Sequence, residues 1–341
     1  MADASDRSSR LARTLLTAGG VAAGAYAGLT GARWWYERSL PAPASLPGAL
    51  DWTSRTLETP AGRGHCYVRP GTGPPVVLLH SFNAVASPLE MAPVARHLAD
   101  TTDRPLYAVD WLGFGRSDRP AIDYAPSVYA DQLYQVLTDA TDGPADLVAL
   151  SLGCEYAAWM ALQAAPRVRR LVLISPTGLT ADRGPSRAGR LALGLAGPAG
   201  LFDLFYYRLT RRASLRRYYE RQVFLDPDAV PAPLVDYAET TAHAKGAPHA
   251  PRRFVDGSLY LPDVASEIYG RLYRPTLLLT PATPGPTIQS FDRLPALLDQ
   301  NGRDLTHRTL PGGLMPQWEA PAAFTDALDA FLSTPVAAEP K

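Results

Sequence analysis

The sequence predicts an α/β fold, a mostly parallel twisted sheet with helices on both faces and an inserted helical cap. Short apolar runs alternate with segments of helical length, and this alternation is typical of a parallel sheet covered on both faces. It stops after Thr177 and resumes with the strand that starts at Pro275, and residues 178–262 form the expected cap. A chain of 341 residues is long enough for one large core with such an insertion.

The pattern divides the chain into five segments. The sheet domain takes residues 41–177 and 263–335, on either side of the cap. An N-terminal segment, residues 1–40, precedes it, and a short tail, residues 336–341, follows it. Residues 39–50 are rich in proline and read as a spacer between the N-terminal segment and the domain.

The N-terminal segment predicts a single membrane-spanning helix over residues 14–33. Between Arg13 and Arg33 lie 19 consecutive uncharged residues, which as a helix span roughly 28 Å, close to the hydrocarbon thickness of a bilayer. An aromatic cluster suited to the headgroup region follows directly and consists of Trp34, Trp35 and Tyr36. The excess of arginines before the run places the N-terminus in the cytoplasm and the globular part on the extracytoplasmic side.

Glycines at four-residue spacing give this helix one smooth face, formed by Gly20, Gly24 and Gly28. Such a face lets a second transmembrane helix approach closely, so a membrane partner is expected there. Two other interpretations stay open. Ala25-Tyr26-Ala27 resembles a signal-peptidase site, and the run is rich in Ala and Gly rather than Leu. A cleaved signal and a soluble helix are therefore the alternatives.

The elements of the sheet domain are expected in a regular order. Before the cap they are a hairpin at 51–69, strands at 75–80, 106–110, 145–150 and 171–174, and helices at 88–99, 127–140 and 153–164. After the cap they are strands at 275–279 and 305–310 and helices at 292–299 and 321–332. The strands are short apolar runs bounded by turn residues, as in buried parallel sheets.

Three motifs fall on these elements. The stretch ALSLG at residues 149–153 lies between a strand and a helix, and small residues flank Ser151 where a sharp turn needs them. The stretch HSFN at residues 80–83 ends an earlier strand, and DWLGFGRS at residues 110–117 ends the next. In these motifs the chain resembles the α/β-hydrolase superfamily over about residues 70–335, with ALSLG as its nucleophile elbow.

The resemblance implies a set of site residues. Ser151 takes the nucleophile position, the backbone N–H groups of Phe82 and Leu152 form the oxyanion hole, and three residues border the pocket: His80, Ser81 and Asn83. The other catalytic positions are replaced. The acid's turn reads TPATPGP at residues 280–286, with Pro284 at the acid. The base's loop reads PGGLMPQWE at residues 311–319, with Leu314 at the histidine.

Histidines elsewhere in the chain and one glutamate are the other candidates for a base. His80 is expected to be structural, His307 to lie below the site and His97 to lie on a remote helix. The cap histidines, His243 and His249, are the ones able to hang over Ser151. Glu155 follows the elbow, where a carboxylate also suits a helix N-terminus.

Composition limits the partners. Lys+Arg and Asp+Glu both number 33, so no nucleic-acid partner is indicated, and neither a metal nor a cofactor is expected. The cap mixes basic with aromatic residues, which fits either an interfacial helix on anionic lipid or an ordinary solvated face. The basic residues are Arg208, Arg211, Arg212, Arg216, Arg217 and Arg221.

The sequence therefore supports two functional hypotheses. The first is a membrane-anchored, non-catalytic binding or assembly subunit with a small-molecule ligand under the cap. The alternative is an active serine hydrolase of the esterase or lipase kind, with a rearranged triad around Ser151. A serine hydroxyl without a positioned base is a weak nucleophile, and two replaced positions favour the first hypothesis.

Overall fold

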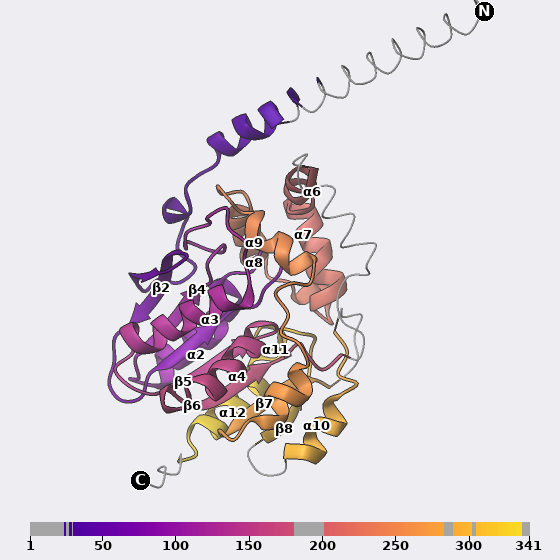
Figure 1. Cartoon of the computed structure of the whole chain (residues 1–341). Helices are drawn as coiled ribbons and strands as arrows, with labels where there is room; N and C mark the ends of the chain where they lie inside the picture. The colour runs from indigo at the N-terminus through magenta and orange to yellow at the C-terminus, as the bar shows by residue number, and fades with distance from the viewer. Residues whose placement is uncertain are drawn as a thin grey trace, which may run out of the picture.

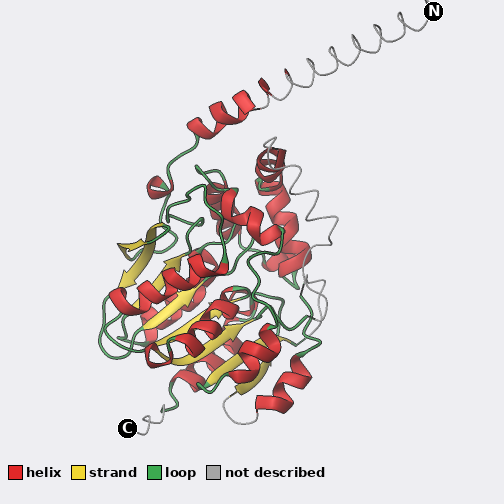
Figure 2. Ribbon diagram, viewed as in Figure 1, coloured by secondary structure: helices red, strands yellow, loops and turns green. Residues whose placement is uncertain are grey.

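The computed structural model describes residues 24, 27–28, 30–180, 201–282, 289–301 and 305–335. Its centre is a sheet in the order β1-β2-β4-β3-β5-β6-β7-β8 (Figures 1 and 2). The strands are β1 (Thr53–Thr59), β2 (Gly62–Arg69), β3 (Val76–Leu79), β4 (Leu106–Asp110), β5 (Ala145–Leu150), β6 (Val168–Ile174), β7 (Thr276–Pro281) and β8 (Leu305–Leu310).

Strand direction agrees with the predicted parallel sheet. The hairpin β1–β2 is antiparallel, and β2 pairs antiparallel with β4. From β4 to β8 every neighbouring pair is parallel. Because the carboxyl ends of parallel strands meet at one edge of a sheet, Ser151 after β5 and His80 after β3 lie at the same edge.

Helices cover both faces of the sheet. Alternate residues of β5 divide between two buried clusters: Leu147 and Ala149 belong to one, Val148 and Leu150 to the other. The first cluster also takes side chains from α3 (Pro126–Gln135), α4 (Gly153–Gln163) and α10 (Leu294–Asn301). The second takes them from α2 (Ala92–Thr101) and α12 (Pro321–Leu332). The two-residue period of a strand thus supplies both layers.

The chain leaves the sheet after β6 and returns at β7, as expected for an inserted cap. The helices there are α6 (Leu201–Leu209), α7 (Arg212–Tyr218), the π-helical turn η5 (Tyr219–Val223), α8 (Ala232–Ala242) and α9 (His249–Val255). In Figure 1 they gather on one side of the sheet domain. The arginines named in the sequence point mostly to solvent, but Phe202, Tyr206, Tyr207 and Tyr219 are buried. Most of the cap aromatics are therefore core residues.

Other helices complete the domain. Two 3₁₀ turns, η1 (Pro43–Ser45) and η2 (Pro88–Met91), precede α2, and the π-helical turn η3 (Val136–Ala140) extends α3. Further short turns are η4 (Ala165–Arg167), η6 (Pro227–Ala229), η7 (Val264–Ile268) and η8 (Tyr269–Arg271). A four-residue helix, α11 (Pro316–Glu319), lies just before α12 and was not expected. The strand predictions before and after the cap are confirmed to within a few residues.

The N-terminal segment is described only in part. Residues 30–39 are helical, whereas residues 1–23, including Gly20, lie outside the described residues. Across the part of the chain that the structure describes, no helix is both long and apolar enough to cross a membrane. The described helix contacts the cap: Arg33 pairs with Asp203 at 2.8 Å, and the rings of Tyr36 and Tyr207 meet edge to face.

The proline-rich segment is not a free spacer, contrary to the prediction. Leu40, Leu46 and Ala49 are buried. The segment bonds to the sheet domain, where Arg116 donates to the carbonyl of Ala44 and the N–H of Ala49 donates to Tyr67. It also bonds to the cap through Lys245 and Tyr237, which donate to the carbonyls of Pro41 and Pro47. The carbonyls of Pro41 and Pro47 can accept these bonds because they lie outside the helices and strands of the domain.

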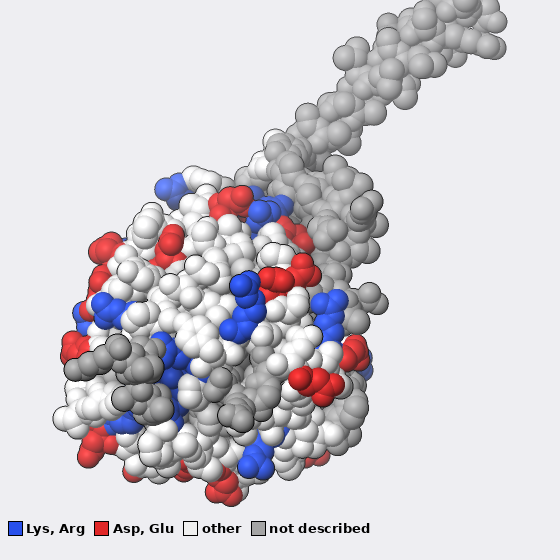
Figure 3. Space-filling view, turned by 60° about the horizontal axis from the view of Figure 1, so that its bottom comes forward, with Lys and Arg blue, Asp and Glu red and all other residues white. Residues whose placement is uncertain are grey.

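Charge is dispersed on the face drawn in Figure 3, where basic and acidic side chains alternate over a mostly uncharged surface. That distribution agrees with the zero net charge of the sequence. This face carries no basic stripe of the kind that binds nucleic acid among the residues drawn.

Candidate active site

Ser151 sits on a strained turn between β5 and α4. Its φ of 55° lies in the left-handed region, which is costly for a side chain with a Cβ. The N–H of Ser151 donates to the carbonyl of Ile174 at 2.8 Å, and its carbonyl accepts from Cys154 at 3.0 Å. A Cβ at Gly153 would lie 2.7 Å from the carbonyl oxygen of His80. The backbone here has the form of a nucleophile elbow, and it requires glycine two residues after the serine.

A cavity of about 130 Å³ opens beside Ser151. Its wall combines the ends of β3, β5 and β6 with the cap and with the loops after β7 and β8. The lining residues used below are Ser81, Phe82, Asn83, Glu90, Ser151, Tyr218, Tyr219, Phe254, Tyr260, Gln289 and Leu314. The predicted pocket residues Ser81 and Asn83 are in this wall. His80 is not, because its buried ring turns toward Trp111.

Gln289 provides the one side-chain hydrogen bond to Ser151 Oγ within the described part of the chain, with Nε2 donating at 2.9 Å. It comes from the loop after β7, the loop in which the acid was expected. Pro284 itself lies outside the described residues. An amide N–H donated to the hydroxyl oxygen occupies a lone pair and takes no proton from it. Gln289 was not predicted as a site residue, because it follows the expected acid position, Pro284, in a loop without a recognisable pattern.

Leu314 lies in the cavity wall. It is almost fully buried, and its N–H donates to the carbonyl of Val223 in the cap at 2.8 Å. The Glu319 carboxylate accepts from the N–H groups of Leu225 and Asp226 and also from Gly313. The loop therefore fixes the cap to the sheet domain. The loop residues around Leu314 therefore have a structural role in holding the cap.

The two backbone N–H groups predicted to form the oxyanion hole are those of Phe82 and Leu152. Neither the N–H of Phe82 nor that of Leu152 has an acceptor among the described residues. Leu152 immediately precedes α4, where backbone N–H groups of a helix are free to bind negative charge. The Phe82 ring is buried among Trp111, Tyr129 and Tyr156, so the position of its backbone is fixed.

Glu90 is a second residue that the sequence analysis missed. It lines the same cavity from η2, and its side chain is buried. Its carboxylate accepts from the Ser81 N–H at 2.9 Å and from Asn83 Nδ2 at 3.0 Å. Burial raises the pKa of Glu90 to about 7, and the hydrogen bonds from Ser81 and Asn83 offset part of that rise. A local signal was weak because a lone Glu before a helix usually faces solvent.

Glu155, which was weighed as a charge at the start of α4, has another role. It is fully buried, accepts from the Thr177 hydroxyl at 2.6 Å and accepts from the Leu261 N–H at 2.9 Å. It therefore joins the elbow helix to the two ends of the cap insertion. Such a group is a positioning residue, since both its oxygens are engaged away from Ser151.

None of the histidines of the described chain lines the cavity. Burial lowers the pKa of His80 to about 4; its Nδ1 faces the Ser81 carbonyl and its Nε2 accepts from the Trp111 N–H. Neither cap histidine supplies a base to Ser151, because neither lines the cavity. Nδ1 of His243 lies against the carbonyl of Glu239, and Nδ1 of His249 against that of Arg119.

The predictions that His97 and His307 lie away from the site are confirmed, because neither residue lines the cavity. His97 contacts Asp329 between α2 and α12, and His307 contacts Thr280 on the sheet edge, with burial lowering its pKa. Both histidines are held away from the cavity by these contacts.

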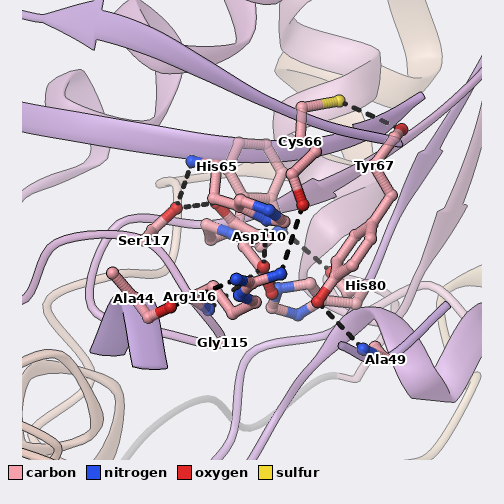
Figure 4. Close-up of polar contacts among 12 residues, drawn as sticks. Ala44, Ala49, His65, Cys66, Tyr67, His80, Asp110, Gly115, Arg116 and Ser117 are labelled. Carbon is pink, nitrogen blue, oxygen red and sulfur yellow. Dashed lines mark hydrogen bonds and ion pairs between the residues drawn. The ribbon is translucent and has the colours of Figure 1, made fainter. Parts of the chain in front are cut away.

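A serine, a histidine and an aspartate do meet elsewhere, around Asp110 (Figure 4). The ring of His65 contacts Asp110 at 2.8 Å. The Ser117 hydroxyl, however, donates to the Asp110 carbonyl and accepts from the backbone N–H of His65, so it does not touch the imidazole. Gly115 packs so closely that a Cβ would overlap the Asp110 carboxylate. This buried cluster holds the DWLGFGRS turn together and is not a triad.

Comparison with known proteins gives the same fold. A sequence model described as alpha/beta hydrolase fold matches residues 74–225. Among curated relatives, 2-hydroxymuconate semialdehyde hydrolase of Pseudomonas sp. (strain CF600) is 37% identical over 112 residues, 32% of this chain and 39% of that protein. The 1-acylglycerol-3-phosphate O-acyltransferase ABHD5 of Rattus norvegicus is 34% identical over 109 residues, 30% of each chain. The chain thus spans only about a third of the length of its curated relatives.

Solved structures extend the likeness over most of the chain. An esterase from Exiguobacterium antarcticum superposes with a TM-score of 0.65 at 18% identity, covering 83% of this chain and 100% of that one. Carboxylesterase CesB from Bacillus subtilis gives a TM-score of 0.62 at 16% identity, covering 91% and 99%. With the sheet order and the matched family model, these findings show that the chain has the α/β-hydrolase fold.

Proposed function

We propose that this protein binds a small molecule under its cap, is held at a membrane by its N-terminal segment and does not operate a serine–histidine–acid triad. The observation that carries the proposal is the environment of the Ser151 hydroxyl. Gln289 donates a hydrogen bond to Oγ, and apolar Leu314 forms the wall where a base is needed. A hydroxyl in this setting keeps its proton, while the cavity beside it remains available to a ligand.

The test is labelling of Ser151 by a fluorophosphonate probe, which reacts fast only with an activated serine. We expect labelling no faster than that of the Ser151→Ala variant, and unchanged p-nitrophenyl ester turnover in that variant. Without partners, a serine hydrolase retains only ~10³–10⁴-fold catalysis over water. An active esterase run in parallel verifies the probe. Rapid labelling that disappears in Ser151→Ala would contradict the non-catalytic function.

A second candidate, a hydrolase with a rearranged catalytic set, is favoured by one observation. Glu90 is the carboxyl group in the cavity wall, and its pKa of about 7 suits a general base near neutral pH. In that reaction Glu90 takes the Ser151 proton as Oγ bonds to an ester carbonyl, and returns it to the departing alcohol. Esterase activity that depends on both Ser151 and Glu90, and rises with pH through about 7, would select this candidate.

Attachment to a membrane is supported by the surface around the N-terminal helix. Trp34 and Trp35 are 58% and 71% exposed. The neighbouring cap helix α6 exposes Leu204, Phe205 and Leu209. Large apolar side chains beside arginines fit a headgroup interface, and the uncharged run that precedes Arg33 fits the span. With the arginine bias of the sequence, the globular part lies on the extracytoplasmic side in this proposal.

An assembly role for the anchor is supported by the glycine face. A Cβ built on Gly24 or on Gly28 has no neighbouring atom within 4 Å in the described structure. The chain itself therefore leaves this surface open to a second transmembrane helix. We propose that the glycine face binds such a helix in the bilayer.

A further inference from the structure

The cavity beside Ser151 has an unusual wall for its size. Among its described lining residues, Glu90 is the one charged side chain, and lysine, arginine and histidine do not occur there. Aromatic residues are frequent among the other lining residues. They are Tyr218, Tyr219, Phe254 and Tyr260, together with Phe82, whose ring packs into the core.

The Glu90 carboxylate has no cationic side chain within ion-pair distance among the residues that the structure describes. It accepts two hydrogen bonds, from Ser81 and Asn83, and a carboxylate has about four acceptor sites. Its backbone is fixed, because Gln317 and Trp318 both donate to the Glu90 carbonyl. A buried carboxyl group held in this way is short of a positive partner.

The aromatic rings favour the same kind of ligand. Phe254 and Tyr260 contact each other with ring centroids 5.7 Å apart, and Tyr218 and Tyr219 do so at 5.3 Å. The faces of aromatic rings carry negative partial charge and attract cations, above all ammonium groups that are poorly hydrated. Two ring pairs and a carboxylate around one cavity therefore supply the components of a cation-binding cage.

We infer that the cavity binds a small organic cation, an ammonium group with short alkyl substituents, with Glu90 as its counter-charge and the aromatic rings as its walls. The inference rests on the proposed binding function and names the ligand's chemical class. An anionic ligand is disfavoured because the described wall offers it no basic side chain. A large ligand is disfavoured because about 130 Å³ is well below the roughly 300 Å³ at which drug-sized pockets begin.

The experiment uses choline as probe, with its uncharged isostere, in which carbon replaces nitrogen, as the matched ligand. Isothermal titration calorimetry on the full chain in detergent at about pH 8 should give a dissociation constant at least tenfold lower for choline. Choline binding should weaken toward about pH 5, because the carboxylate form of Glu90 is the binding form. Tyr218 and Tyr219, which face Glu90, stay protonated throughout, since burial raises the pKa of each.

Two variants test the two halves of the cage. Glu90→Gln keeps the side-chain size and should abolish the preference for choline over its isostere. Phe254→Leu, at a partly buried position, keeps an apolar wall but removes a ring, and should weaken choline binding severalfold while sparing the isostere. Glu58→Gln is the control, because Glu58 is exposed on β1 away from the cavity.

The outcomes separate this inference from the proposed function. Equal affinity for choline and the isostere would overturn the cationic ligand and leave the binding function standing. Choline selectivity that survives in Glu90→Gln, or no binding of choline at millimolar concentration, would also overturn the inference. Fluorophosphonate labelling of Ser151 decides the non-catalytic function independently of all these results.

Discussion

Replacing Glu90 with glutamine should change the pH dependence of stability more than the stability itself. Glu90 is buried, and its pKa is raised from 4.5 to about 7 because desolvation disfavours the charged form. At 1.36 kcal/mol per pH unit, that difference corresponds to about 3 kcal/mol. The folded state therefore holds this proton more tightly than the unfolded state does.

The direction follows from linkage. As pH rises above about 4.5 the unfolded chain loses the Glu90 proton first, so the free energy of unfolding falls until the folded group has also ionised, near pH 7. Glutamine does not titrate. It keeps one acceptor oxygen for Ser81 or Asn83 and loses the other, so at low pH the variant should be slightly less stable than the parent. Relative to the parent, the variant should gain about 3 kcal/mol between about pH 4.5 and about pH 8.

The assay is urea unfolding followed by circular dichroism at several pH values, for the parent, Glu90→Gln and the exposed control Glu58→Gln. Other titrating groups cancel in the difference between variant and parent, which isolates Glu90. A difference between Glu90→Gln and the parent that stays constant within ~0.5 kcal/mol over this range would refute the assignment of a raised pKa to a desolvated carboxyl group.

Three further predictions concern the elbow, the replaced triad and the anchor. Ser151→Gly should be about 1 kcal/mol more stable to urea than Ser151→Ala, because glycine accepts the φ of 55° without a Cβ clash; equal stabilities would argue against strain at this turn. Leu314→His with Pro284→Asp should gain weak p-nitrophenyl esterase activity that neither single variant shows, and equal activity in the parent would contradict the assigned positions. The full chain should stay in membranes after alkaline carbonate washing and a chain beginning at Pro41 should not. The Gly24→Leu variant should remain inserted in the membrane but lose any co-purifying membrane partner, and retained partners would mean that the glycine face does not bind a helix. A mature N-terminus at Gly28 would instead indicate signal cleavage.

The sheet and the elbow were predictable because their signals are local. An apolar run such as that of β5 is recognisable within six residues, and the small residues around Ser151 are required by the turn itself. The assignment of Leu314 to the histidine position also depends on a local pattern, that of residues 311–319, and it stays a prediction. Patterns of this kind can be recognised from the sequence without knowledge of the tertiary structure.

The polar partners of the site were not predictable because they arrive from distant segments. Gln289 reaches Ser151 across 138 residues of sequence, from a loop with no regular pattern. The backbone of Glu90 is held by Gln317 and Trp318, which are 227 and 228 residues away in the sequence. The cap aromatics were ambiguous for a similar reason: basic and aromatic residues alternate in sequence, and only the packing shows that Tyr206 and Tyr207 turn inward.

The segment from Leu40 to Ala49 has a mechanical consequence. It is bonded at one end to the cap through Lys245 and along its length to the sheet domain through Arg116 and Tyr67. A domain attached in this way is held rigidly by the segment and is not connected through a flexible linker. If the preceding helix spans a bilayer, this attachment fixes both the tilt of the globular domain and its distance from the membrane. The same segment, residues 40–49, bonds to both the cap and the sheet domain. Moving the cap away from the sheet domain would therefore require these hydrogen bonds to break first.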